Sequence, residues 1–438
     1  MSNASAHSGY VPSKISSISR RGFIAAGTAV TAATWTAQSY GNIQGANDRL
    51  RVGFIGVGGM GGNHINAIAR LKQTNNLEPI AVADCWTRRA EAAAGTVGAK
   101  EFFQDYRKVI DRDDIDYVTI ATPEHWHSKM TIEAFKSGKH VYCEKPMTHR
   151  IPEALEVIKA QKETGKAMQV GVQGMSDDSY ESAAEAIAEG ECGIVVQAQI
   201  EYVRRYGPAG PWRDPEMIKR ELNGRAERPS DLDWNAWLGH APATDWDPHR
   251  YFEWRNYSAY SGGIATDLFI HRLTRIMKAC KLTYPRRVVG MGGIWQWPDG
   301  RDLPDNFEMI VEYPRGMTVY VLGTQSNRVG VDHVIRGYRG TLYFTNTGWV
   351  IRDKDGKVLA SHRKSGGEDI SLHHTNLHNH IRNGDELHCP AELGLAGVIA
   401  VNMANESWRT GRMMGWDREK MQMVPADQLD FDPTVTSG

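Results

Sequence analysis

The sequence lacks a long hydrophobic run. None of its apolar stretches reaches the roughly 18 to 20 residues that a transmembrane helix needs. Even the segment after Phe23 is rich in Ala, Thr and Gly, and Gly27 interrupts it. We therefore expect no membrane span and a soluble mature protein.

An excess of charge of either sign is also missing. The 51 Lys and Arg side chains nearly balance the 52 Asp and Glu side chains, and the formal net charge is −1. A protein that gathers nucleic acid or an anionic membrane surface through its overall field needs a clear positive excess. We therefore expect small-molecule partners and no nucleic acid.

Cysteine is scarce and widely spaced. The five cysteines are Cys85, Cys143, Cys192, Cys280 and Cys389. An odd total without a CxxC pair indicates neither a zinc site nor a disulfide framework. We expect these cysteines to be buried thiols.

The N-terminal segment combines paired arginines with a weakly apolar stretch. The sequence SRRGF at residues 19–23, followed by small residues to about Ala37, resembles a twin-arginine export signal. The alternative is an ordinary amphipathic helix. The twin-arginine pathway moves folded proteins, so an exported enzyme could carry a cofactor that it bound in the cytoplasm. We expect residues 1–46 to be signal and linker, and the protein to be periplasmic or secreted.

A glycine-rich turn follows the linker. The sequence LRVGFIGVGGMGG predicts a strand, a turn and then a helix over about residues 60–71. In the G-x-G-x-x-G pattern, Gly56 permits the tight turn, Gly58 lets backbone approach a pyrophosphate, and Gly61 lets the helix pack closely. Gly59 and Met60 lie between them in the predicted phosphate-binding turn.

The next predicted strand ends in Asp84. A carboxylate at this position accepts hydrogen bonds from the adenosine ribose and repels a 2′-phosphate, which favours NAD. Arg88 and Arg89 follow closely, and a guanidinium near the ribose is how such sites accept NADP. The alternative is a solvated pair in the first turn of the next helix. NAD is thus the expected cofactor, with NADP possible.

Alternating patterns predict the fold class. Helical patterns over about residues 105–110, 126–136 and 152–164 alternate with strand patterns at 116–122, 140–146 and 167–172. Such alternation predicts an α/β, doubly wound parallel sheet, which we assign to residues 47–173. From about Gly193, period-two patterns and hairpin turns predict a sheet domain within residues 174–438. The segment from Ala391 to Trp408 predicts a long helix that packs back on the first domain.

Four motifs in order resemble one family. They are GVGGMGG, TPEHWH at residues 122–127, CEKPM at 143–147, and SGGIATDLFIH at 261–271. Together they resemble the glucose-fructose oxidoreductase, inositol dehydrogenase and MocA family. The resemblance implies a Rossmann domain followed by an α+β domain with a large, mostly antiparallel open sheet. Because that sheet often forms oligomer interfaces in the family, we expect a dimer or tetramer.

The resemblance also implies an active site. Carried over by motif, Lys145, Asp267 and His271 line it beside the nicotinamide. His271 suits the task of accepting a hydroxyl proton near neutral pH. Without the resemblance, a lysine before a proline is an ordinary loop cation and an i, i+4 Asp/His pair is a surface pairing. Further cofactor-side residues are expected to be Thr122, Pro123, His127, Glu144 and Gln173, whereas His125 is expected only to pack.

Candidate substrate residues lie in a Trp-rich segment between Pro211 and Tyr260. Indole faces stack on sugars, but long loops also bury aromatics to anchor themselves. Trp254 and Arg255 are the expected substrate contacts. The sequence GVQGMSDDSY departs from the family pattern because acidic residues stand where many relatives carry a basic one, so recognition on this side of the pocket stays open.

Three histidines near residue 377 have a spacing that can bind a metal ion. His374 and His378 are four residues apart and His380 is near. No HExxH motif is present and hydride chemistry needs no metal, so we expect an amphipathic helix and no metal.

Three functions compete. The leading hypothesis is an exported NAD(P)-dependent oxidoreductase of a sugar, cyclitol or related polyol, with Lys145 and His271 in proton transfer and Asp267 orienting. A redox-neutral NAD-dependent glycoside hydrolase is the alternative, and it suits export equally well. A non-catalytic binding protein is the third, and the joint presence of Lys145, Asp267 and His271 argues against it.

Overall fold

The first sheet is parallel and has six strands. The computed structural model describes residues 48–314 and 316–430, and the predicted twin-arginine segment lies outside them. The strand order is β3-β2-β1-β4-β5-β6. Its strands are β1 (Leu50–Ile55), β2 (Leu77–Ala83), β3 (Glu101–Phe103), β4 (Tyr117–Ile120), β5 (His140–Glu144) and β6 (Met168–Gly171). Its helices are α2 (Gly59–Leu71), α3 (Thr87–Val97), α4 (Arg107–Ile110), α5 (Glu124–Lys136) and α6 (Ile151–Thr164).

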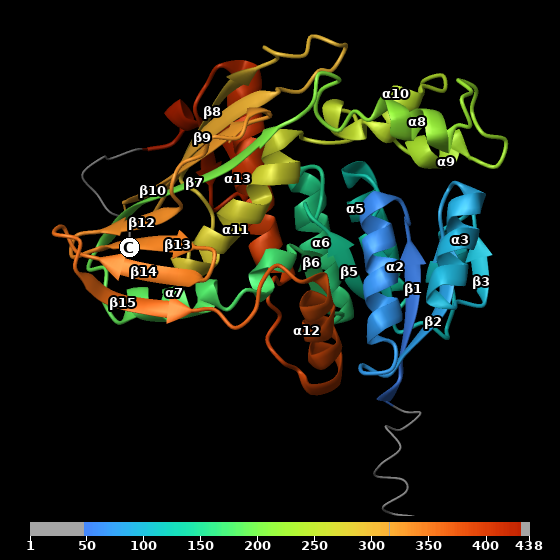
Figure 1. Cartoon of the computed structure of the whole chain (residues 1–438), viewed down its shortest axis with the longest axis horizontal. Helices are drawn as coiled ribbons and strands as arrows, with labels where there is room; N and C mark the ends of the chain where they lie inside the picture. The colour runs from blue at the N-terminus through green and yellow to red at the C-terminus, as the bar shows by residue number, and fades with distance from the viewer. Residues whose placement is uncertain (1–47, 315, 431–438) are drawn as a thin grey trace, which may run out of the picture. The chain divides into compact units, whose positions relative to one another are not determined.

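This sheet confirms the predicted Rossmann fold. Its central strands are almost wholly buried, as expected where helices cover both faces of a parallel sheet. The chain reverses direction across the sheet between β1 and β4, and the carboxyl ends of strands at such a reversal form the usual ligand crevice. Figure 1 shows this half in blue to teal.

The second sheet is large and mostly antiparallel, as predicted. Its order is β15-β14-β13-β12-β7-β10-β9-β8-β16-β17, with β11 beside β7, and β7 and β10 run parallel. Its strands are β7 (Val195–Arg205), β8 (Arg287–Gly293), β9 (Asn306–Tyr313), β10 (Met317–Thr324), β11 (Ser326–Asn327), β12 (Val334–Gly337), β13 (Thr341–Thr345), β14 (Gly348–Arg352), β15 (Val358–Arg363), β16 (Met414–Asp417) and β17 (Gln422–Pro425).

Helices cover one face of the second sheet. They are α7 (Ser179–Ala188), α11 (Ile270–Ala279) and α13 (Ala391–Thr410). Burial alternates along β9 and β10, so every second side chain faces these helices. The boundary near residue 173 stays a prediction.

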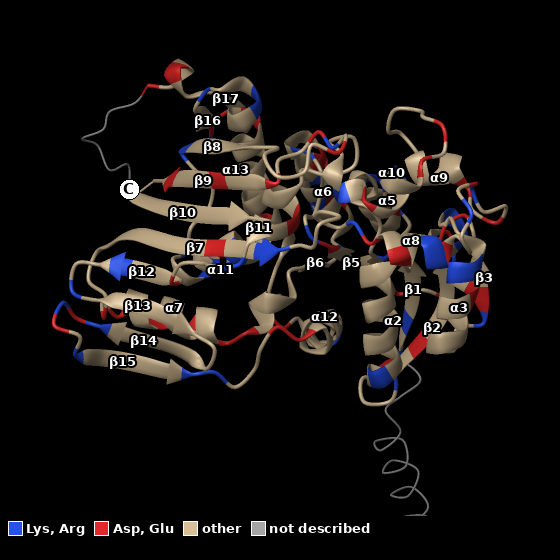
Figure 2. Cartoon of the chain, turned by 45° about the horizontal axis from the view of Figure 1, so that its top comes forward, with Lys and Arg blue, Asp and Glu red and all other residues tan. Residues whose placement is uncertain are grey.

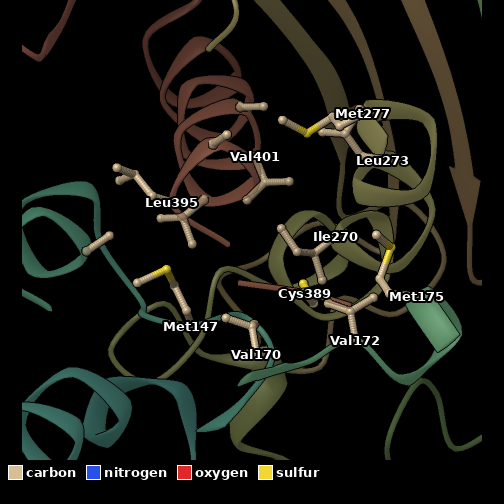
Figure 3. Packing of buried hydrophobic residues seen from close by; sticks show 14 of the residues in the cluster. Met147, Val170, Val172, Met175, Ile270, Leu273, Met277, Cys389, Leu395 and Val401 are labelled. Atoms are coloured by element: carbon tan, nitrogen blue, oxygen red, sulfur yellow. The ribbon is translucent and has the colours of Figure 1, made fainter. Parts of the chain in front are cut away.

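Helix α13 joins the two sheets, as expected for this segment. Figure 3 shows Leu395 and Val401 of α13 among Met147 and Val170 from the first half and Ile270 from α11. A Cβ atom on Gly394 would lie 2.8 Å from the sulfur of Met147, so only glycine allows this close approach.

Residues 211–260, here called the aromatic insertion, carry three short helices. These are α8 (Pro215–Glu221), α9 (Trp234–Leu238) and α10 (Pro248–Phe252). Trp234 and Trp237 stack with ring centroids 4.8 Å apart, inside a cluster that also buries Trp86 of the first half. Most tryptophans of the insertion therefore anchor it, and Figure 1 shows it beside α3.

The histidine-rich segment is a buried helix, α12 (Ile370–Asn383). His374 Nε2 lies 2.8 Å from His64 Nδ1, and His378 Nε2 lies 2.7 Å from the hydroxyl of Tyr117. Within residues 48–314 and 316–430, no cluster of three or more acidic, Cys or His side chains is arranged to hold a metal ion. The structure gives these histidines packing and hydrogen-bonding partners instead.

Neither half of the described structure carries charge of one sign alone (Figure 2), in line with the balanced composition. Figure 2 shows acidic and basic residues mixed over both halves. None of the helices in the described part of the chain is both long and apolar enough to span a bilayer. The five cysteines are free thiols, of which Cys143, Cys192 and Cys389 are buried while Cys85 and Cys280 are half-buried, so the expectation of burial was wrong for two of them.

Candidate active site

A cleft of about 1320 Å³ opens at the carboxyl ends of the parallel strands. One part of it is lined by the glycine turn and the end of β2, and another part by the second sheet and the π-helix before α11. The predicted site residues that line it are Gly56, Gly58, Gly59, Met60, Asp84, Thr122, Pro123, Glu144, Lys145, Gln173, Trp254, Arg255, Asp267 and His271.

The glycine turn has the geometry that a dinucleotide requires. Gly56 has φ of +78°, a conformation that side chains rarely adopt. A Cβ on Gly61 would lie 2.1 Å from the carbonyl oxygen of Gly56, so Gly61 packs behind the turn rather than in the cleft. The turn leads directly into α2, whose first N–H groups favour a bound anion. These residues fit a pyrophosphate.

Asp84 is fixed beside the turn. Its Oδ2 accepts a hydrogen bond from the backbone N–H of Val57 at 2.8 Å, and its Oδ1 accepts one from Trp86 at 2.9 Å. The carboxylate is nearly buried but lines the cleft. It is therefore held where a ribose hydroxyl can reach it.

Lys145, Asp267 and Arg255 form one ionic cluster. Lys145 Nζ donates to Asp267 Oδ1 at 2.6 Å and to its backbone carbonyl at 3.0 Å, and Arg255 Nε donates to the same Oδ1 at 2.8 Å. Burial by itself raises the pKa of the Asp267 carboxyl, but Arg255 and Lys145 outweigh it and hold that pKa well below its usual range. Asp267 is thus a fixed anion that orients the lysine.

Asp267 lies in an irregular helical turn. Residues Ala265–Phe269 form a π-helix that continues into α11. His271 is the second residue of α11. We predicted an orienting role for Asp267. Within the described residues, the imidazole of His271 has no hydrogen-bond partner and Asp267 is held by cations. Single-turn π-helices are frequent at functional sites.

His271 faces the cleft with an uncharged ring. Burial lowers the pKa of its imidazole well below the usual value, and the charges of Lys145 and Arg275 lower it further. The ring centroid lies 6.1 Å from that of Tyr202 in β7. A neutral imidazole has one unprotonated nitrogen that can accept a proton, although the lowered pKa also makes this ring a weaker base.

The other cofactor-side residues fall into two groups. Glu144 lines the cleft, and its Oε1 lies 3.0 Å from His64 Nε2. Gln173 also lines the cleft, and its buried Oε1 has no partner within the described residues. His127 lies behind the cleft, where its nitrogens are 2.7 Å from the carbonyl of Pro146 and 2.9 Å from that of Thr122. It positions both loops and does not reach the cleft.

Sequence reasoning missed a buried glutamate. Glu124, in the motif TPEHWH, begins α5 and accepts hydrogen bonds from Ser261 Oγ at 2.6 Å, Thr266 Oγ1 at 2.9 Å and Gly262 N at 3.1 Å. It therefore holds the turn that leads to Asp267. Its position inside a recognised motif was the available signal.

Residues on the far wall of the cleft were also missed. They are Tyr202 and Arg204 of β7, and Tyr202 lies near His271. Trp212 and Trp254 of the predicted Trp-rich segment line the cleft as well, and the guanidinium of Arg255 stacks on Trp254 at 4.1 Å. The period-two pattern predicted the strand β7 but not which of its side chains would face the cleft.

Arg88 and Arg89 are both paired. Both guanidinium groups stack on Trp86, at 4.0 and 4.5 Å from its ring centroid, and both pair with Glu221 of α8. The interpretation as a solvated pair was therefore wrong for Arg89, whereas the side chain of Arg88 is 39% exposed.

Two family models match the chain. The description "Oxidoreductase family, NAD-binding Rossmann fold" matches residues 50–172, and "Oxidoreductase family, C-terminal alpha/beta domain" matches residues 210–431. The second alone covers half of the chain. The chain belongs to the glucose-fructose oxidoreductase, inositol dehydrogenase and MocA family. Residues 50–172 are an NAD-binding Rossmann domain of this oxidoreductase family.

Relatives within the family are similar over part of their length. The inositol 2-dehydrogenase of Rubrobacter xylanophilus is 37% identical over 155 residues, which cover 35% of this chain and 44% of that protein. A glycosyl hydrolase family 109 protein of a Shewanella species is 32% identical over 177 residues, covering 34% and 38%. The matched segments thus span less than half of these relatives.

A solved structure shares the fold. A levoglucosan dehydrogenase in complex with NADH and levoglucosan superposes with a TM-score of 0.63 and 18% identity, covering 86% of this chain and 99% of that one. At this identity the likeness shows the fold alone.

Proposed function

We propose that this protein is an exported, NAD-dependent oxidoreductase of a sugar, cyclitol or related polyol that retains its cofactor during turnover. One observation carries the proposal: the glycine turn and the group Lys145, Asp267 and His271 line the same cleft. A dinucleotide held at the turn can therefore end beside groups able to handle a hydroxyl proton.

The chain's own residues suit alcohol oxidation. Bound NAD supplies the acceptor for the hydride that leaves the carbinol carbon. His271, which is uncharged, accepts the hydroxyl proton, and Lys145 donates a hydrogen bond to the oxygen as it becomes a carbonyl. Asp267 holds Lys145 in place. One hydride and one proton leave the alcohol, and both return when a carbonyl co-substrate is reduced in the same cleft.

Export explains why the cofactor is retained. Outside the cytoplasm, released NADH has no pool in which to be reoxidised, so a two-substrate cycle regenerates it in place. The twin-arginine sequence at residues 19–23 supports export of a folded, loaded protein. The aromatic insertion lines the adenosine side of the same cleft through Glu221, Asp233 and Tyr251.

The substrate class rests on the cleft wall and on the relatives. Trp254 and Arg255 line the same cleft as Asp267, and Arg255 both pairs with Asp267 and stacks on Trp254, so an aromatic ring and a guanidinium stand where a polyhydroxylated ring would bind. Inositol 2-dehydrogenase and levoglucosan dehydrogenase are named for such substrates.

The redox-neutral glycoside hydrolase is the second candidate, and the similarity to a glycosyl hydrolase family 109 protein favours it. Chromogenic glycosides separate the two functions. Oxidoreduction requires a carbonyl co-substrate for each turnover and releases no aglycone. Release of the chromophore without any added acceptor would replace our proposal with the hydrolase.

We also propose that the protein is a homo-oligomer that pairs through the open face of the second sheet. Val289, Ile310 and Tyr320 stand side by side on neighbouring strands of this face, and Ile310 is exposed. A monomer mass in light scattering would rule this out.

A further inference from the structure

We infer that Glu221 of α8 sets the preference for NAD over NADP by occupying Arg89, the arginine of the cleft wall that would otherwise bind a 2′-phosphate. Glu221 is therefore a specificity-determining residue that acts through Arg89. Nothing in the proposed substrate or reaction enters this inference, which concerns only the dinucleotide.

Arg89 lies where the adenosine ribose of a bound dinucleotide is expected. It lines the cleft together with Asp84, the carboxylate at the end of β2. A Cβ atom built on Gly58 would lie 3.4 Å from Arg89 Nη1, so the guanidinium reaches the phosphate-binding turn. An arginine at this position in a Rossmann domain is the usual partner of a 2′-phosphate.

Glu221 neutralises this cation from the other half of the chain. Its Oε2 lies 3.2 Å from Arg89 Nη2 and 3.5 Å from Arg88 Nη2, and its backbone carbonyl accepts a further hydrogen bond from Arg88. Tyr251 adds a contact of 3.3 Å between its hydroxyl and Arg89 Nη1. Both arginines also stack on Trp86, so Arg89, the one that lines the cleft, cannot turn toward a phosphate without leaving these partners.

The consequence is a double rejection of NADP. Asp84 repels the 2′-phosphate, and Glu221 occupies the guanidinium donors of Arg89 that would bind it. The pairing of Glu221 with Arg89 costs NAD no hydrogen bond, because the carboxylate of Asp84 lines the cleft and can accept hydrogen bonds from the ribose hydroxyls of NAD. Removing the charge of Glu221 should therefore improve NADP binding and leave NAD binding nearly unchanged.

Native mass spectrometry of the full chain provides a test that needs no activity. Each protein is equilibrated with equal concentrations of NAD⁺ and NADP⁺, and the ratio of the two bound species is measured. We expect Glu221→Gln to raise the share of NADP⁺ about tenfold, as a freed charge-assisted contact implies. The matched control is Glu216→Gln, an exposed glutamate of the same helix, which should leave the ratio unchanged.

A variant that lacks both arginines tests whether Glu221→Gln acts by freeing their guanidinium groups or by disturbing the cofactor site in general. In a protein with Arg88→Gln and Arg89→Gln, adding Glu221→Gln should raise the share of NADP⁺ much less than it does in the wild type, because no guanidinium is left to be freed. The inference is overturned if Glu221→Gln leaves the ratio as in the wild type, or if it raises the share of NADP⁺ as much without the arginines as with them.

Discussion

At the scale of single residues, Lys145 is the group on which the proposed chemistry depends most. It is nearly buried and contacts Asp267 through two hydrogen bonds. If it is replaced by alanine, Asp267 keeps Arg255 as a cationic partner, so the fold should survive. We expect Lys145→Ala to lower turnover by about 10²- to 10⁴-fold, the usual worth of a positioned acid or base, with little loss of bound dinucleotide.

The measurement compares steady-state turnover with the amount of dinucleotide per chain. Lys159→Ala, at an exposed position of α6, serves as the matched control and should behave as the wild type. Turnover of Lys145→Ala close to the wild-type rate would remove the lysine from the mechanism.

Glu124 is the residue from which we expect a dependence of stability on pH. Burial raises the pKa of its carboxyl to about 7, against the hydrogen bonds from Ser261 and Thr266 that favour the ionised form. The unfolded chain loses this proton near its ordinary pKa, whereas the folded chain keeps it until about pH 7. Stability from this group is therefore greatest at low pH and falls as the pH rises through that window.

The isosteric Glu124→Gln variant has no such proton. Its unfolding free energy relative to the wild type should therefore rise by about 3 kcal/mol between pH 4.5 and pH 8, an order-of-magnitude figure from the size of the pKa shift. Urea unfolding of both proteins at the two pH values measures this difference. A difference that does not change with pH would show that Glu124 is ionised throughout.

Local sequence predicted which residues belong to the site better than it predicted their contacts. Lys145 and Asp267 stand in motifs, so the resemblance placed them, although the pairing of Asp267 with Arg255 depends on how the insertion folds back. His127 also stands in a motif. Only the tertiary structure shows that its ring lies outside the cleft, with its two nitrogens close to two backbone carbonyl oxygens. A sequence motif fixes which residues are near a site but not which way each side chain points.

At the scale of elements, the aromatic insertion is the part that we expect to retain the cofactor. It is attached to the start of α3 at Asp231, whose carboxylate accepts from Trp86 Nε1 at 3.1 Å and from the backbone N–H of Arg88 at 3.2 Å. Leu232 adds an antiparallel bridge to Trp86. Loosening this attachment should open the adenosine side of the cleft.

We expect Asp231→Ala to speed dissociation of bound NADH by up to about thirtyfold, since each of two lost hydrogen bonds is worth about 1 kcal/mol. The decay of cofactor fluorescence after mixing with excess NAD⁺ gives the rate. Asp245→Ala, at an exposed position of the same insertion, is the control. Equal rates in the wild type and Asp231→Ala would mean that the insertion does not retain the cofactor.

The elements also differ in how well the sequence predicted them. The parallel strands are near-continuous apolar runs between glycine turns, and their positions agreed within a few residues, as for α2, which begins at Gly59 instead of Met60. β3 has three residues with little burial and gave no pattern. The π-helix and the docking of the insertion were not predictable, because both depend on partners distant in sequence, such as Glu124 and Trp86.

At the scale of the whole molecule, the two halves share one core and one cleft. Helix α13 packs on α6 and on the second sheet, and its glycines let Met147 and Ile270 approach closely. The cleft takes its phosphate-binding turn from the first half and Asp267 from the second. Cofactor binding and catalysis are therefore expected to require the intact chain.

Export of a loaded enzyme remains the central proposal, and the fate of its cofactor tests it most directly. The exported protein should be purified and dialysed extensively, and its ultraviolet spectrum and the mass of any released ligand should be recorded. We expect about one nicotinamide dinucleotide per chain to remain, with the mass of NAD, because one Rossmann cleft holds one dinucleotide. A chain that emerges empty and binds neither NAD nor NADP in a titration would contradict the proposal.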